Sequence, residues 1–166
     1  MELFKKGKVI KSWGVVFAGL KRQWLTPTQV VKYCKEGSIV CNELRLEKLK
    51  AALDDSLFDF FKLIKEFIIE DGQPEIAWNE DSLREFFYSI PQQYLVFWEI
   101  EFLLRVVSSN EDNEEKLYKV FSFHADYNFP ASWNNFLYIG PEEVPGGIDG
   151  KYSNLLDYIE LKLNRI

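Results

Sequence analysis

The stretch of sequence that decides the fold is FSFHADYNFPASWNNFLYIGP, residues 121–141. Seven of its 21 residues are Phe, Tyr or Trp, and it lies between a helix-like pattern and a loop rich in Pro and Gly. Because aromatic side chains bury a large area, this density predicts a folded corner that joins a helical body to a terminal helix. The residues that we assign to this structural corner are Phe121, His124, Asp126, Tyr127 and Pro130.

On both sides of this corner, apolar residues recur at the spacing of helices. The clearest helix start is at residues 26–29, where Thr26 and Gln29 can satisfy each other's backbone amides and Pro27 suits the first turn. The run 57–70 is apolar over more than half of its circumference, which predicts a central helix. The expected helices cover residues 11–24, 27–36, 44–53, 57–70, 83–89, 92–108, 114–124 and 152–163.

The pattern therefore predicts an all-α fold, with residues 1–166 forming a single compact domain of about eight helices. No long alternation of apolar and polar residues indicates a strand, although residues 8–10 and 136–139 are compatible with short ones. In the helix at 114–124, we expect Leu117, Tyr118 and Phe121 to face inward. In the segment 44–53, Leu44, Leu46, Leu49 and Leu53 continue a roughly helical spacing.

Length and composition are those of an ordinary globular protein. The chain has 166 residues, of which 47% are hydrophobic, 28% charged and 16% aromatic. A chain of this length buries roughly 70% of the surface that its unfolded form exposes, which is enough for one core. No apolar run reaches the length of a membrane span and no secretory signal opens the chain, so we expect a cytoplasmic protein.

Charge is unevenly distributed around the formal net value of −6. Residues 1–50 carry 11 Lys and Arg against 4 Asp and Glu, a balance of +7, whereas residues 51–166 carry 9 against 22, a balance of −13. The two parts can attract one another within the fold. Otherwise the acidic part draws basic partners and repels nucleic acid, despite the cations near Trp13 and Trp24. We expect a protein partner and no nucleic acid.

Candidate catalytic and metal-binding residues have simpler structural explanations. His124 is the only histidine, and beside Asp126 it could be oriented as a general base, but no nucleophile motif accompanies it. Paired acids such as Glu114-Glu115 stand at expected helix starts or in loops, where the helix dipole and solvation favour them. We expect no enzyme activity, no metal and no cofactor; the alternative is a small hydrolase that uses acidic residues with His124.

Two further motifs are interpreted as structural. Cys34 and Cys41 are the only cysteines, and no second Cys or His pair completes a metal site, so a buried thiol pair is expected, with disulfide and metal roles as alternatives. Gly146-Gly147 with Gly150 lacks the preceding strand and the Gly-Lys-Ser/Thr ending of a phosphate-binding loop. We predict a turn there.

The corner also carries a family resemblance. The segment 124–130 (HADYNFP), followed by Trp133, Phe136 and the segment 138–141 (YIGP), resembles the ending of the bacterial domain-of-unknown-function 2247 family. The opening 13–31, with its Trp, Gly, Trp-Leu-Thr and Val-Val elements, is similar to the opening of that family. The resemblance implies a small helical bacterial protein of the cytoplasm, and an immunity role beside polymorphic toxin systems.

A small acidic protein rich in aromatic residues suits that implied role. It could dock on the basic surface of a toxin domain, steered by charge and anchored by a few buried rings. The residues that we assign to this partner-binding patch are Trp133, Tyr138, Glu142 and Glu143. A generic interaction module that binds a host protein is the other alternative.

Overall fold

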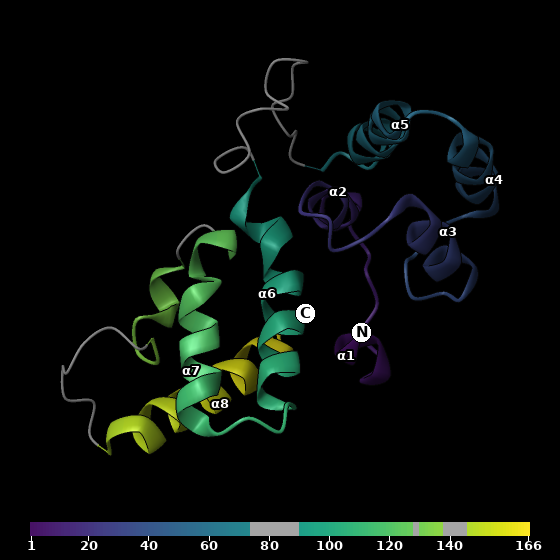
Figure 1. The fold of residues 1–166 in the computed structure, drawn as a ribbon. Coiled ribbons are helices and arrows are strands. Elements are labelled where there is room, and N and C mark those ends of the chain that lie inside the picture. Colours follow the sequence, from purple (N-terminus) through teal and green to yellow (C-terminus); the bar gives the residue numbers. More distant parts are fainter. Residues whose placement is uncertain (74–89, 128–129, 138–145) are drawn as a thin grey trace. The chain divides into compact units, whose positions relative to one another are not determined.

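The computed structural model describes residues 1–73, 90–127, 130–137 and 146–166. These residues are all-α, as predicted, with eight α-helices and three short 3₁₀ turns among them (Figure 1). Their one β feature is an isolated parallel bridge between Ile10 and Ile39. The expected helix at 83–89 and the second half of the possible strand at 136–139 lie outside the described residues.

The chain forms two compact units. Unit 1 consists of Met1–Leu3 and Glu99–Ile166, and unit 2 consists of Phe4–Trp98. The boundary falls inside α6 (Gln92–Val107), whose first seven residues belong to unit 2. That residues 1–166 form a single domain stays a prediction.

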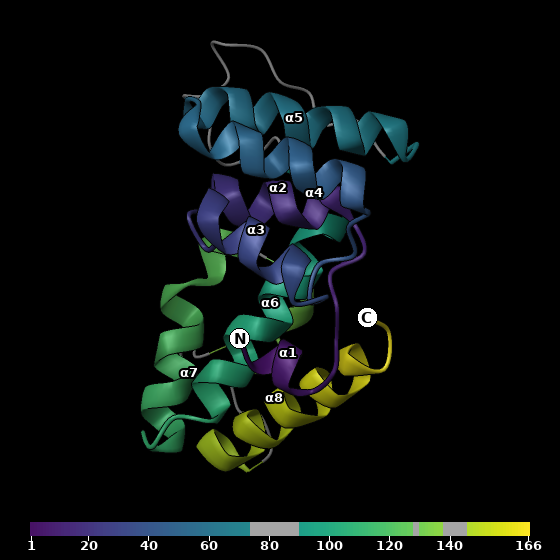
Figure 2. The same ribbon diagram turned by 90° about the vertical axis from the view of Figure 1, so that its right-hand side faces the viewer.

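The core of unit 2 is built on α2 (Trp13–Lys21) and α5 (Leu57–Glu70), which lie side by side (Figure 2). Trp13 meets Phe67 edge-on with ring centroids 4.9 Å apart. Phe17 meets Phe61 in the same way at 5.2 Å. The helix α5 starts at the Ser56 cap and has five buried apolar residues, so the predicted central helix is confirmed.

The first half of α6 packs closely against two glycines of α2. A Cβ atom placed on Gly14 would lie 2.1 Å from the ring of Tyr94, and one placed on Gly19 would lie 2.3 Å from the ring of Trp98. The indole N–H of Trp98 donates to the carbonyl of Val15 at 2.8 Å, which fixes the ring in place. Glycine is therefore required at these positions by contact and not by backbone conformation.

The helix α3 (Pro27–Lys35) begins as the sequence predicts. The Thr26 hydroxyl accepts from the Gln29 amide at 3.2 Å, and the Gln29 side chain accepts from the Thr26 amide at 2.9 Å. This reciprocal pair satisfies two of the amides that a helix start leaves free. Gly37, just past the helix, has φ +75°, as expected of a residue that ends a helix.

Thr26→Ala is expected to lower the free energy of unfolding by about 1 kcal/mol, because the Gln29 amide loses its acceptor. The matched control is Thr28→Ala in the same helix, which removes an exposed threonine with no capping role. Urea denaturation of both variants measures the difference. Equal losses of stability from the two substitutions would contradict the capping role.

The helix α4 (Glu43–Ala51) exists as expected. Of the four leucines at helical spacing in 44–53, Leu49 is buried, and Leu44 is 69% exposed. One turn before Leu49, the Arg45 guanidinium lies over the ring of Phe67 and pairs with Asp71 at 2.7 Å. This contact fixes the rotation of α4.

Unit 1 contains the second half of α6, α7 (Asn113–Ser122) and α8 (Gly147–Leu163), and α7 packs against α8. The 3₁₀ turns η3 (His124–Tyr127) and η4 (Ala131–Trp133) follow α7. The buried Glu101 carboxylate accepts from the amides of Glu2 and Leu3, at the start of α1 (Glu2–Lys5). The sequence reasoning did not predict α1.

Two details of unit 1 correct the expectations. The buried residues of α7 are Lys116, Leu117 and Val120, so the inward position of Leu117 is confirmed. The inward positions predicted for Tyr118 and Phe121 were wrong, because both residues are exposed. The terminal helix begins at Gly147, five residues earlier than expected, and includes Gly150. The turn itself lies at Gly146, which has φ +88°.

Candidate partner-binding surface

The corner predicted at 121–141 is organised around Trp133. Trp133 is the last residue of η4, which Pro130 precedes, and its indole is completely buried. His124 stacks on it at 5.5 Å between ring centroids, and Tyr127 and Phe136 lie at 5.4 and 6.0 Å. The density of rings in this stretch therefore forms part of the core of unit 1.

A buried carboxylate is hydrogen-bonded to Trp133. Glu99 of α6 accepts a hydrogen bond from the Trp133 indole N–H at 2.6 Å and another from the Tyr158 hydroxyl of α8. The Tyr158 hydroxyl also lies 3.0 Å from the Ser132 hydroxyl. Sequence reasoning missed Glu99, although an acid inside the apolar run of α6 is a signal that a buried partner must exist.

The Tyr158 hydroxyl links Glu99 to Ser132 in this cluster. Burial raises the pKa of the Tyr158 hydroxyl, and its hydrogen bond to Glu99 raises that pKa further. The Trp133 indole and the Tyr158 hydroxyl supply donors to a carboxylate that would otherwise be buried without them.

The other predicted corner residues lie around this cluster. The His124 ring nitrogen Nε2 is 3.3 Å from the Pro130 carbonyl oxygen. Tyr127 is buried, Asp126 is half-buried, and Phe121 is 42% exposed at the end of α7. Their assignment to a purely structural role stays a prediction.

The structure corrects one member of the predicted partner-binding patch. Trp133 has no exposed surface, because the indole packs among other rings and donates to Glu99. It cannot offer its ring to a partner in this structure. Tyr138, Glu142 and Glu143 lie outside the described residues, so their assignment stays a prediction.

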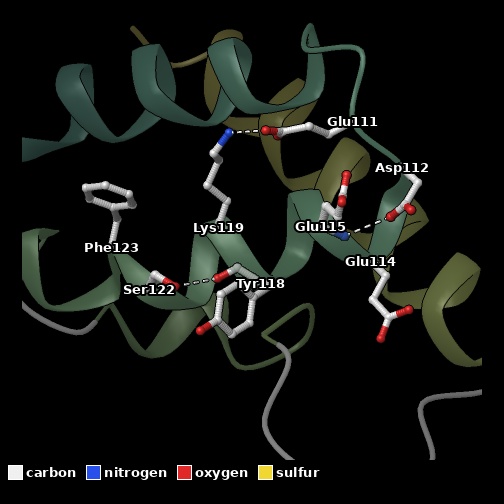
Figure 3. Close-up of a pocket in the computed structure, with 8 residues that line it drawn as sticks. All are labelled: Glu111, Asp112, Glu114, Glu115, Tyr118, Lys119, Ser122 and Phe123. Atoms are coloured by element: carbon white, nitrogen blue, oxygen red, sulfur yellow. Dashed lines mark hydrogen bonds and ion pairs between the residues drawn. The ribbon is translucent and has the colours of Figure 1, made fainter.

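Exposed rings beside acids occur instead on the outward face of α7. A hollow of about 730 Å³, here called the α7 site, is lined by Glu111, Asp112, Glu114, Glu115, Tyr118, Lys119, Ser122 and Phe123. Figure 3 shows these side chains along α7 and the loop before it. Tyr118 is 60% exposed and Phe123 is 44% exposed. Exposed rings that line one hollow are typical of binding surfaces.

Each element of the α7 site has a local reason for its position. The Asp112 carboxylate accepts from the Glu115 amide at 2.9 Å and so caps the helix. The Glu111 carboxylate pairs with the Lys119 ammonium and accepts from the Ser109 hydroxyl, and these contacts lower its pKa. Acids at this end also suit the positive end of the helix dipole.

Phe123, just past α7, is partly anchored by the core. Its ring lies 5.2 Å from that of Phe102 on α6, measured between centroids. One edge of the ring therefore packs on unit 1 while the rest remains open to solvent. A ring held in this way loses little freedom when a partner covers it.

In residues 1–73, 90–127, 130–137 and 146–166, no group of three or more His, Cys, Asp or Glu side chains is placed to hold a metal ion. Across those residues, no helix has the length and apolar character needed to cross a bilayer. Cys34 is buried and Cys41 half-buried, both are free thiols, and burial raises the pKa of Cys34.

A family model described as "Uncharacterized protein conserved in bacteria (DUF2247)" matches residues 1–162. The chain belongs to this family. The resemblance noted at its two ends is therefore confirmed, and the DUF2247 match extends over the segment between them. No curated protein and no solved structure matches the chain.

In this DUF2247 protein, the α7 site could be found from sequence only in part. The acids at 111–115 were recognised as a helix start, and Tyr118 was recognised as part of α7. The helical spacing did not reveal which ring faces water, because Leu117 and Val120 form an equally regular alternative face.

Proposed function

We infer that this protein is a non-catalytic binding protein that acts in the bacterial cytoplasm as an immunity protein, neutralising a cognate toxin by direct contact. The observation that carries the proposal is the α7 site, where the exposed rings of Tyr118 and Phe123 line the same hollow as four carboxylates. The immunity role itself rests on the family resemblance at the two ends of the chain. The partner that we propose is a basic toxin domain.

Charge supports a basic protein as the partner. Unit 1 carries 6 Lys and Arg against 13 Asp and Glu, a balance of −7, whereas unit 2 carries 14 against 13, a balance of +1. A negative field of this size speeds the encounter with a basic surface and disfavours a polyanion. The exposed rings then supply the apolar contact that holds the complex.

The proposal is tested by growth rescue. We expect the neighbouring gene to encode a protein ending in a toxin domain that stops growth when expressed, and co-expression of this protein to restore growth. Absence of such a toxin, or no rescue together with no detectable complex, would contradict the immunity role. A complex with a different host protein would instead support a generic interaction module.

Tyr118→Ala combined with Phe123→Ala is expected to abolish rescue while the protein stays folded, with a loss of about 1 kcal/mol from the contact between Phe123 and Phe102. The matched control is Leu161→Ala on α8, which removes an apolar side chain that is also half exposed in the same unit. Growth of the co-expressing strains and urea midpoints of the purified variants are measured. Full rescue by the double variant would place the contact elsewhere.

A further inference from the structure

The two cysteines of the chain lie together in unit 2. Cys34 is in the last turn of α3, and Cys41 immediately precedes Asn42, the cap of α4. The Cys34 thiol is within hydrogen-bonding reach of the Cys41 sulfur. The packing of α3 against α4 therefore brings the two sulfur atoms of the chain to one place (Figure 1).

The backbone between the two thiols is held by hydrogen bonds. Gly37, which has φ +75°, lies just past α3. The amides of Ser38 and Ile39 both donate to the Tyr33 carbonyl, at 2.9 and 3.1 Å, and Ile39 forms the bridge to Ile10. Little chain entropy is therefore left to lose when the two sulfurs approach to the roughly 2 Å of a disulfide bond.

The two thiols differ in access and in acidity. Cys34 is buried, whereas Cys41 is half-buried, so Cys41 is the sulfur that a small reagent meets first. Burial raises the pKa of both thiols, and at Cys41 the Cys34 thiol and the Arg45 guanidinium act in the opposite direction. Because both pKa values are raised, the reduced pair gains no stabilisation as a thiolate, unlike the pair of a strongly oxidising protein.

We propose that Cys34 and Cys41 form a reversible disulfide by exchange with a low-molecular-weight disulfide such as oxidised glutathione. The Cys41 sulfur attacks one sulfur of the reagent, whose S–S bond breaks, and one reagent thiol leaves with the Cys41 proton. The Cys34 sulfur then attacks the Cys41 sulfur, and the second reagent thiol leaves with the Cys34 proton. The protein loses two electrons and two protons, and the reagent gains both.

The disulfide ties the end of α3 to the start of α4. Because it closes only the short loop 34–41, its effect on the unfolded chain is moderate, and we expect the Tm of the oxidised protein to be about 5 °C above that of the reduced protein. In the cytoplasm such bonds are typically transient and respond to the redox state. The inference is independent of the proposed function, which rests on the α7 site in unit 1.

Mass spectrometry of the full-length protein tests the proposal. The protein is equilibrated with a glutathione buffer, and free thiols are trapped with excess N-ethylmaleimide in denaturant. Where oxidised glutathione predominates, we expect a monomer that carries neither N-ethylmaleimide nor glutathione. Where reduced glutathione predominates, we expect N-ethylmaleimide on both cysteines. Free thiols in the oxidised buffer, glutathione retained on both cysteines or a disulfide-linked dimer would overturn the inference.

Two single variants test the order of attack. Cys34→Ala leaves Cys41 without a partner, so we expect it to end as a mixed disulfide with one glutathione. Cys41→Ala leaves only the buried Cys34 thiol, which we expect to stay free. Glutathione on Cys41→Ala and not on Cys34→Ala would contradict Cys41 as the first sulfur to react.

Melting temperatures in the two buffers test the tie between α3 and α4. The wild type is expected to melt at a higher temperature in the oxidised buffer, whereas Cys34→Ala and Cys41→Ala, which cannot form the bond, are expected to melt equally in both buffers. An unchanged melting temperature of the oxidised wild type, or an equal rise in the two variants, would overturn the stabilising role of the disulfide.

Discussion

Trp133→Phe is expected to lower the free energy of unfolding by about 3 kcal/mol, since it removes a buried hydrogen bond to a charged group and part of a packed ring. The phenylalanine ring keeps most of the apolar contact with Tyr127 and Phe136. What it cannot replace is the N–H that reaches Glu99 at 2.6 Å. Urea denaturation at neutral pH measures the loss.

A second substitution separates the two causes. Replacing Glu99 by leucine as well removes the carboxylate that Trp133→Phe leaves short of a donor. Because an apolar group of similar size does not need hydrogen bonds, we expect the double variant to be more stable than Trp133→Phe alone. If Trp133→Phe costs less than about 0.5 kcal/mol, a value typical of surface substitutions, the corner is not the core of unit 1.

Gly19→Ala is expected to destabilise the protein by about 2 kcal/mol, because the added methyl group meets the ring of Trp98 at 2.3 Å and overpacks the core. Helix propensity alone predicts the opposite sign, since alanine is favoured over glycine in a helix by about 1 kcal/mol. The Trp98 ring cannot move aside without losing its hydrogen bond to the Val15 carbonyl. Thermal and urea unfolding measure whether Gly19→Ala lowers or raises the free energy of unfolding.

The cause of the Gly19→Ala effect can be tested with a smaller ring. Trp98→Phe makes room at the contact, so we expect Gly19→Ala to cost less in the Trp98→Phe background than in the wild type. A stabilising effect of Gly19→Ala in the wild-type background would show that α2 and the first half of α6 are not in close contact.

Local signals in the sequence were reliable wherever neighbouring residues alone determine the structure. The capping box, in which Thr26 and Gln29 bond each other's backbone amides, depends on four successive residues and forms as predicted. The run 57–70 is apolar around so much of its circumference that a buried helix is the favourable outcome whatever its rotation. The all-α class follows from signals of this kind.

Rotation of the less apolar helices could not be predicted in the same way. In α7, Leu117 and Val120 compete with Tyr118 and Phe121 for the inward face, and packing against other elements decides between them. Among the described residues, exposed rings therefore lie on α7 and directly after it, at Tyr118, Phe121 and Phe123. Trp133, the most prominent ring of the sequence pattern, stabilises the fold while less prominent rings line the surface.

The central claim is that the α7 site, and not the buried ring cluster around Trp133, contacts a basic protein partner. Isothermal titration calorimetry of the purified protein with its cognate toxin domain tests this claim most directly. For Tyr118→Ala combined with Phe123→Ala, the account predicts affinity weaker by about a hundredfold, the effect of losing two hot-spot rings, in a protein that remains folded. An affinity equal to that of the wild type would contradict it.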